Sequence, residues 1–175
     1  MQERYSGTQQ ALHWATLVLF LVQLWTYPAI ARTHHAPHLG VPIEPLDLVL
    51  HQIHALSGGI ILLFVGLRLW LRFRHPIAAP SFPMAYFAKI SNLTHIGIYT
   101  VLILLPITGF LKMYIISIAG PVHVILTRVL YALIVLHIGG ALVHVIIWRD
   151  GLLERMGIKL PFQRAALKQF RNIQQ

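Results

Sequence analysis

The chain has 175 residues, of which 57% are hydrophobic and only 11% are charged. Its mean hydropathy of +0.68 indicates more apolar surface than one soluble core could bury, so we expect lipid as the solvent. The sequence contains no cysteine, which excludes disulfides, thiolate metal sites and iron–sulfur clusters. The formal net charge of +9 comes from residues that flank apolar segments, and so indicates a lipid bilayer with anionic headgroups and no nucleic acid.

Four segments are long and apolar enough to cross a bilayer, which takes about 20 helical residues. They cover about 10–31, 47–73, 91–116 and 119–148, and the connections between them are rich in proline and glycine. This order predicts an all-α integral membrane protein, an up-down four-helix bundle. Pro106 followed by Gly109 predicts a kink in the third span. Gly120-Pro121 is expected to punctuate the third connection, and the loop between the first two spans is expected near 32–45.

The first apolar stretch, from Ala11 to about Ala31, is long enough to span and lacks a small-residue cleavage site, so we expect it in the mature protein. We expect residues 1–150 to form the transmembrane domain. Residues 151–175 would form a basic cytoplasmic tail, in which 162–173 is either an amphipathic helix on the membrane surface or disordered.

Lysine and arginine set the orientation, because short cytoplasmic loops retain positive charge. The second connection and the tail are basic, whereas the first connection has only Arg32, accompanied by Glu44 and Asp47. Both termini are therefore predicted to be cytoplasmic.

Histidine is the residue type that calls for a function. Six of the eleven histidines lie inside or at the ends of the predicted spans: His13, His54, His95, His123, His137 and His144. Ionisable groups at membrane depth are costly and mark cofactor, ion or proton pathways. Any one of them alone is more often a packing histidine, so the argument depends on their arrangement.

His123 and His137 are 14 residues apart, so they share one helix face at two depths roughly 21 Å apart. His54 matches the outer depth of His123, and His13 matches the inner depth of His137. Two histidine pairs stacked in one bundle predict two b-type haems, each with its iron held by imidazole on both faces. Glycines next to His54 and His137 would leave room for the porphyrin rings.

Two assignments stay open. His51 lies three residues before His54 on nearly the same face, so it is either the outer ligand or a hydrogen-bond partner of a haem propionate. We favour His54 because it lies deeper. Arg68, at the inner level, is either the partner of a propionate of the inner haem or an ordinary positive-inside residue.

His95 and His144 lie toward the cytoplasmic side, and His144 shares the face of His137. A quinone that is reduced at a membrane surface needs a titratable hydrogen-bond partner beside an electron donor. We predict that His144 is a quinone-site residue, and that His95 either shares this role or is a structural contact near a propionate.

The outer surface is expected to be cationic. Arg32, Lys112 and Arg128 lie there with a cluster of histidines, His34, His35 and His38. Such a surface would attract a small anionic reductant to the outer haem, although Lys112 and Arg128 also suit plain snorkelling.

These residues resemble the bacterial cytochrome b561 family, in particular its small di-haem superoxide oxidases, over nearly the whole chain. The matching stretches are Tyr5-Ser6 to His13-Trp14, Ile53-His54 to Arg68, His95 to Tyr99 with Leu105-Pro106 and Gly109, His123 with His137, and His144 with Trp148-Arg149-Asp150. The third connection is shorter than the resemblance leads us to expect.

The resemblance implies that His13 and His137 ligate the cytoplasmic haem b, that His54 and His123 ligate the periplasmic one, and that His144 lies near the ubiquinone site. It also implies a multi-pass protein of the bacterial inner (plasma) membrane that oxidises superoxide to oxygen on the periplasmic side and reduces ubiquinone near the inner haem.

Two other functions are weighed against this one. A cytochrome b subunit would pass electrons for a partner dehydrogenase or hydrogenase, but the compact outer loop leaves little room for a protein redox partner. A histidine-based metal transporter would need carboxylates beside the histidines in the spans, and the sequence has none there.

Overall fold

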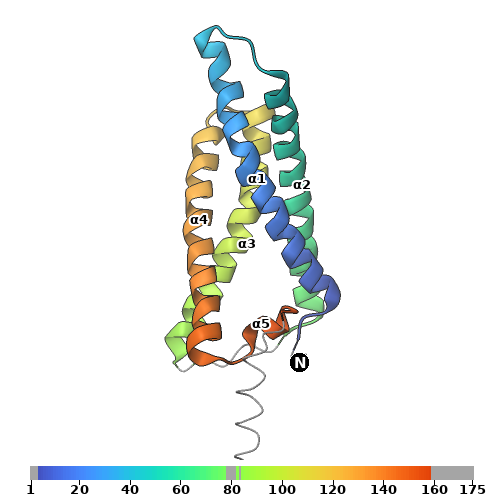
Figure 1. Cartoon of the computed structure of the whole chain (residues 1–175), viewed down its shortest axis with the longest axis vertical. Helices are drawn as coiled ribbons and strands as arrows, with labels where there is room; N and C mark the ends of the chain where they lie inside the picture. The colour runs from blue at the N-terminus through green and yellow to red at the C-terminus, as the bar shows by residue number, and fades with distance from the viewer. Residues whose placement is uncertain (1–3, 78–81, 83, 159–175) are drawn as a thin grey trace, which may run out of the picture.

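The computed structural model describes residues 4–77, 82 and 84–158. In chain order its elements are α1 (Gly7–Leu39), α2 (Pro45–Arg74), α3 (Ala85–Tyr114), α4 (Ala119–Val143), the π-helix η1 (His144–Trp148) and α5 (Leu152–Arg155) (Figure 1). The predicted all-helical fold is confirmed. The predicted surface helix at 162–173 lies outside the described residues.

Four of these helical segments are long and apolar enough to cross a membrane, with η1 continuing the fourth from Ala119 to Trp148. Most of their large apolar side chains are exposed, as lipid-facing side chains must be in a bundle too small to bury them. Helices satisfy most backbone N–H and C=O groups within the span, which is what a hydrocarbon solvent demands; Pro28 and Pro106, which lack an N–H, are exceptions. The fold is therefore that of a membrane four-helix bundle.

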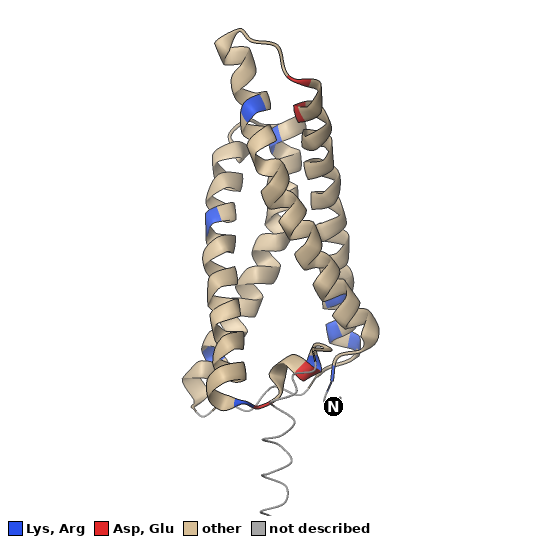
Figure 2. Ribbon diagram, viewed as in Figure 1, with Lys and Arg blue, Asp and Glu red and all other residues tan. Residues whose placement is uncertain are grey.

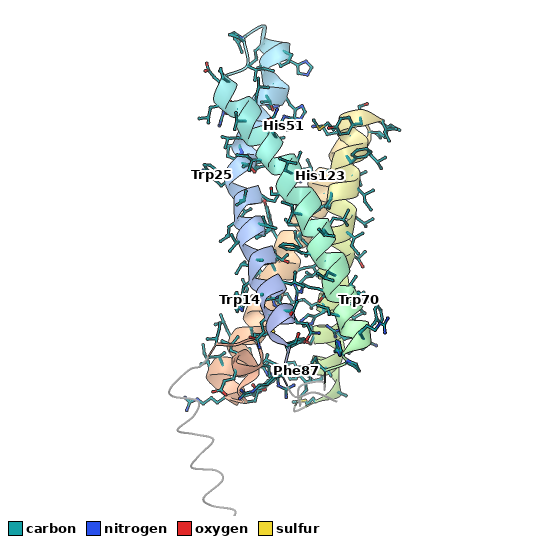
Figure 3. The ribbon with its side chains drawn as sticks, turned by 90° about the vertical axis from the view of Figure 1, so that its right-hand side faces the viewer. Trp14, Trp25, His51, Trp70, Phe87 and His123 are labelled. Atoms are coloured by element: carbon teal, nitrogen blue, oxygen red, sulfur yellow. The ribbon has the colours of Figure 1, made fainter. Side chains whose placement is uncertain are left out.

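Both described chain ends lie at one end of the bundle, which we call the inner end; the α1–α2 and α3–α4 connections lie at the outer end (Figure 1). Figure 2 shows basic residues gathered at the inner end, and Glu44 and Asp47 at the outer end. Figure 3 places Trp14 and Trp70 toward the inner end and Trp25 nearer the outer end. Tryptophan is typical of the two membrane–water interfaces. A cytoplasmic inner end stays a prediction from charge.

The helices associate as two antiparallel pairs, α1 with α2 and α3 with α4, and the pairs meet mainly between α2 and α3. A buried apolar cluster joins α2, α3 and α4 at the middle of the bundle: Ile61, Val65, Val101, Leu102 and Leu130. In α4, Leu130 is seven residues from His123 and seven from His137. The core therefore lies between the two histidine levels.

The first predicted loop is wrong in extent, because α1 continues to Leu39 and carries His34, His35 and His38 on helix. It ends at Gly40, whose φ of 66° suits the left-handed cap. Contacts with α2 hold the extension: Arg32 forms a bidentate ion pair with Asp47 at 2.6 and 2.8 Å. The proline and histidine content indicated a loop, but these tertiary contacts and the glycine cap extend the helix.

Two further boundaries differ from the prediction. α3 begins at Ala85, before the predicted residue 91, and runs through Pro106 as one helix. Gly120-Pro121 lies in the first turn of α4 rather than in the connection, because proline is tolerated where a helix has no carbonyl acceptor for its missing N–H.

Candidate functional site

The outer level is built from His54 on α2 and His123 on α4, both partly buried. Nδ1 of His54 lies 3.0 Å from Oγ1 of Thr26 on α1, and Nδ1 of His123 lies 3.1 Å from Oγ1 of Thr108 on α3. The outer level thus draws on all four long helices.

His123 has a second partner, because its Nδ1 lies 3.0 Å from the carbonyl oxygen of Leu105. A carbonyl only accepts, so Nδ1 carries the proton and the lone pair of the neutral ring is on Nε2. A Cβ added at Gly109 would lie 3.4 Å from this ring. This is ordinary van der Waals contact, so α3 packs against the ring at Gly109.

His51 lies nearer the outer end than His123 (Figure 3). Its ring contacts that of His34 with centroids 5.5 Å apart, and its Nδ1 lies 3.4 Å from Oγ1 of Thr33. These contacts are with the extended part of α1. Of the two alternatives for the outer ligand, His54 is the one that lies deeper, one turn further along α2.

The inner level is built from His13 on α1 and His137 on α4, whose ring centroids lie 6.3 Å apart. Two imidazoles on opposite sides of one iron have centroids roughly 6 Å apart, because an imidazole nitrogen lies about 2 Å from a first-row metal. A Cβ added at Gly139 or Gly140 would meet no atom within 4 Å, so open space adjoins His137. The spacing and this space fit a haem b held by the two rings.

Arg68 on α2 reaches the same level. Its Nη2 donates to Nδ1 of His13 at 3.0 Å, and its guanidinium lies over the ring of Tyr99, 5.5 Å from the centroid. A neutral imidazole that accepts at Nδ1 carries its proton on Nε2. Ligation of iron through Nε2 needs the opposite tautomer. Haem binding at His13 would therefore require Arg68 to turn to another acceptor, and a propionate carboxylate suits it.

His95 on α3 also contacts the inner level, since its ring centroid lies 5.1 Å from that of His137. Its Nδ1 lies 2.7 Å from the carbonyl oxygen of Ser91, so Nδ1 carries the proton and the Nε2 lone pair is available. His95 is thus a neighbour of the predicted inner ligand and itself has a ligand's tautomer.

His144 begins η1 and is buried, with 5% of its surface exposed. Its Nδ1 pairs with Oδ2 of Asp150 at 2.5 Å. The other carboxylate oxygen of Asp150 accepts from the backbone N–H of Leu152 at 3.1 Å, which holds the carboxylate in place. Arg149, at a positive φ of 50°, turns the chain sharply enough to bring Asp150 back to His144.

Aromatic rings surround His144. It makes edge contacts with Trp148 at 4.5 Å and with Phe82 at 5.3 Å between centroids, and Phe87 packs against Trp148 at 5.3 Å. Figure 3 places Phe87 at the inner end of the bundle. The His144 region therefore combines a buried histidine and its partly exposed carboxylate partner with flat apolar surfaces, as a binding site for an aromatic or quinoid ring requires.

Sequence analysis missed three of these residues as functional candidates. The sequence offers one indication for Asp150, because a carboxylate six residues after an intramembrane histidine is a possible partner for it. Thr26 and Thr108 had no signal, because each meets a histidine of a different helix, 28 and 15 residues away in the chain.

The outer end carries a cationic group of side chains. Lys112 Nζ lies 2.7 Å from Nε2 of His34, whereas the charge of Arg32 is paired with Asp47. Among the described residues there is no group of three or more histidine, cysteine or acidic side chains placed to hold a metal ion.

Comparison with known families adds an independent finding. The family model for prokaryotic cytochrome b561 matches residues 4–158. This range contains all four long helices and every histidine discussed above. The chain therefore belongs to the prokaryotic cytochrome b561 family and is a haem b protein of membrane electron transfer.

Proposed function

We propose that the protein is a superoxide:ubiquinone oxidoreductase of the bacterial inner membrane. Two superoxide anions each lose one electron at the outer end and leave as O2. One ubiquinone at the inner end takes up the two electrons and two protons and leaves as ubiquinol.

The two haem b groups of this proposal each use one pair of histidines: His54 with His123 at the outer level, and His13 with His137 at the inner level. When bound, haem b supplies an iron that accepts and donates one electron at a time. The observation that carries the proposal is the His13–His137 centroid separation of 6.3 Å, which fits two axial imidazoles on one iron.

The protein's own residues would act around these ligands. In the proposal Arg68 turns from His13 to a propionate of the inner haem, and so both frees Nδ1–H of His13 and neutralises the propionate. His95, beside His137, would stay a second neighbour of the inner haem.

The inner end would deliver the protons. With Asp150 bonded to Nδ1, Nε2 of His144 is the nitrogen that would hydrogen-bond a quinone carbonyl. Asp150 would hold the imidazole of His144 with Nε2 directed at the quinone. Trp148 and Phe82 would pack against the quinone ring.

The outer end would attract superoxide. Because Arg32 is paired with Asp47, Lys112, beside His34, supplies net positive charge at this end. A positive charge at the mouth of a site raises the encounter rate of a small anion.

The test begins with haem content. We expect the purified protein to bind two haems, and expect His54→Ala or His13→Ala to remove one haem each, while His38→Ala, a histidine of neither pair, leaves two. A reduced-minus-oxidised spectrum calibrated against protein concentration measures this. If the unsubstituted protein binds only one haem, or if either ligand variant still binds two, the ligand assignment is wrong.

The substrate is tested by stopped-flow mixing of the oxidised protein with superoxide. We expect rapid haem reduction, and rapid reoxidation when ubiquinone is present. Two haems that superoxide does not reduce faster than it disproportionates would instead favour an electron-transfer subunit that serves a partner redox enzyme.

A further inference from the structure

Two threonines contact the outer histidine pair in the same way. Thr26 on α1 lies beside His54, and Thr108 on α3 lies beside His123, with Oγ1–Nδ1 distances of 3.0 and 3.1 Å. Thr26 is fully buried and Thr108 is nearly so. Water therefore does not compete for either hydroxyl.

Each hydroxyl also bonds to its own helix. Oγ1 of Thr26 lies 2.8 Å from the carbonyl oxygen of Val22, and Oγ1 of Thr108 lies 2.8 Å from that of Leu104. A hydroxyl has one proton, and a carbonyl oxygen only accepts. With the proton in this back-bond, each threonine oxygen has only lone pairs to offer the neighbouring histidine.

The same proton arrangement follows from the histidines. A neutral imidazole that ligates iron through Nε2 carries its proton on Nδ1, and that N–H needs an acceptor inside the membrane. For His123 the carbonyl of Leu105 independently requires a protonated Nδ1. For His54, Thr26 is the side chain within reach of Nδ1.

We infer that Thr26 and Thr108 are positioning residues for the outer haem: Thr26 accepts the Nδ1–H of His54, and Thr108 shares the Nδ1–H of His123 with the carbonyl of Leu105, so that both threonines fix the tautomer and the ring angle of an axial histidine. This inference rests on the proposed ligation by His54 and His123. It assigns the outer haem a hydroxyl acceptor on both sides, whereas His13 at the inner level has the donor Arg68 at its Nδ1.

The acceptors have an electronic consequence. A hydrogen bond from Nδ1–H increases the electron donation of the imidazole to iron, which stabilises the ferric state. Removal of the acceptor should therefore shift the reduction potential of the outer haem to a more positive value. It should also free the ring to rotate, which changes the g values of the low-spin ferric EPR signal because these depend on the angle between the two imidazole planes.

The experiment compares Thr26→Val and Thr108→Val, which keep the shape of the side chain and remove the oxygen. Thr26→Ser and Thr108→Ser keep the oxygen and should restore the original values. Matched controls are Thr16→Val on α1 and Thr94→Val on α3, since both hydroxyls make the same back-bond and, in the described part of the chain, neither contacts a histidine.

A redox titration and EPR spectra of the full-length holoprotein provide the measurements. We expect each valine variant at 26 or 108 to raise the potential and change the EPR signal of one haem, with the other haem, the serine variants and the controls unchanged. His54→Ala and His123→Ala are measured alongside. If each of these loses one haem but the valine variants match the controls, the inference is wrong and the proposed ligation stands. If either alanine variant keeps both haems, the ligation itself fails.

Where a valine variant binds too little haem to be titrated, the haem content of the serine variant at the same position distinguishes an acceptor role from a packing role. Full haem content in the serine variant, with loss only in the valine variant, supports an acceptor role. Equal loss in the serine, valine and control variants would mean a packing role, and would overturn the inference.

Discussion

At the scale of single residues, the histidines differ in the group that is hydrogen-bonded to Nδ1, and this difference distinguishes their proposed roles. A carbonyl or hydroxyl at Nδ1 leaves Nε2 free for a metal, as at His123 and His95. At His144 the partner is the carboxylate of Asp150, which accepts at Nδ1 and leaves Nε2 to face a bound molecule. In the proposed function the first setting serves haem ligation and the second serves the quinone.

The His144–Asp150 pair gives a prediction at this scale. Asp150→Asn keeps the shape but removes the carboxylate that accepts from Nδ1 of His144, so we expect ubiquinol formation about tenfold slower, with haem reduction by superoxide unchanged. Glu154→Gln is the matched control, because this carboxylate lies in the same inner segment and pairs with Arg4. The rates are measured by stopped-flow reoxidation of the reduced haems by ubiquinone. Equal reoxidation rates in the two variants would refute a role for Asp150 in proton delivery.

At the scale of elements, helix ends depend on tertiary contacts that local propensity does not contain. α1 extends through Pro37 because Gly40 caps it and because Arg32, on that extension, pairs with Asp47 of α2. At the other end of the bundle, Trp14 Nε1 and Gln10 Nε2 donate to the carbonyl oxygens of Met156 and Arg155. These bonds hold the segment that contains α5 against the start of α1.

The Arg32–Asp47 pair gives a prediction at the scale of elements. Asp47→Asn should lower the Tm by roughly 2–4 °C and speed hydrogen exchange in residues 33–39, because a buried carboxylate that fixes a bidentate guanidinium is lost. Glu44→Gln, the same charge change at a position with no side-chain cap bond, should leave both unchanged. Similar Tm values for the two variants would show that the ion pair does not hold the extension. Thermal unfolding in detergent and exchange mass spectrometry provide the measurements.

At the scale of the whole molecule, the bundle keeps two histidine levels apart on one continuous helix, with an apolar core between them. In the proposed function these two levels would each hold one haem, and the apolar core would keep the ions and protons of the two ends apart. The basic inner end and the mixed outer end give the molecule a direction (Figure 2).

The outer charge gives a prediction at the scale of the molecule. Lys112→Gln should slow haem reduction by superoxide about threefold at low ionic strength, and the difference should shrink as salt screens the charge. Lys89→Gln, the same change on the inner half of α3, should have no effect. A reduction rate that does not depend on salt in the unsubstituted protein would exclude electrostatic attraction of the anion.

The amino-acid sequence by itself determined the membrane class, the number of spans, and the pairing of histidines by depth. These follow from hydropathy and from the 3.6-residue period, which are properties of short segments that lipid enforces one helix at a time. That His13 lies at the level of His137 was predictable for this reason, because the spacing of His123 and His137 along one helix defines the depth of both levels.

Only the tertiary structure decided which group is hydrogen-bonded to Nδ1 of each histidine. Thr26 and Thr108 reach their histidines from other helices, and Asp150 reaches His144 through a π-turn and a left-handed Arg149. A hydrogen bond depends on distances of a few tenths of an ångström between atoms far apart in the chain, and no pattern within a single segment determines those distances.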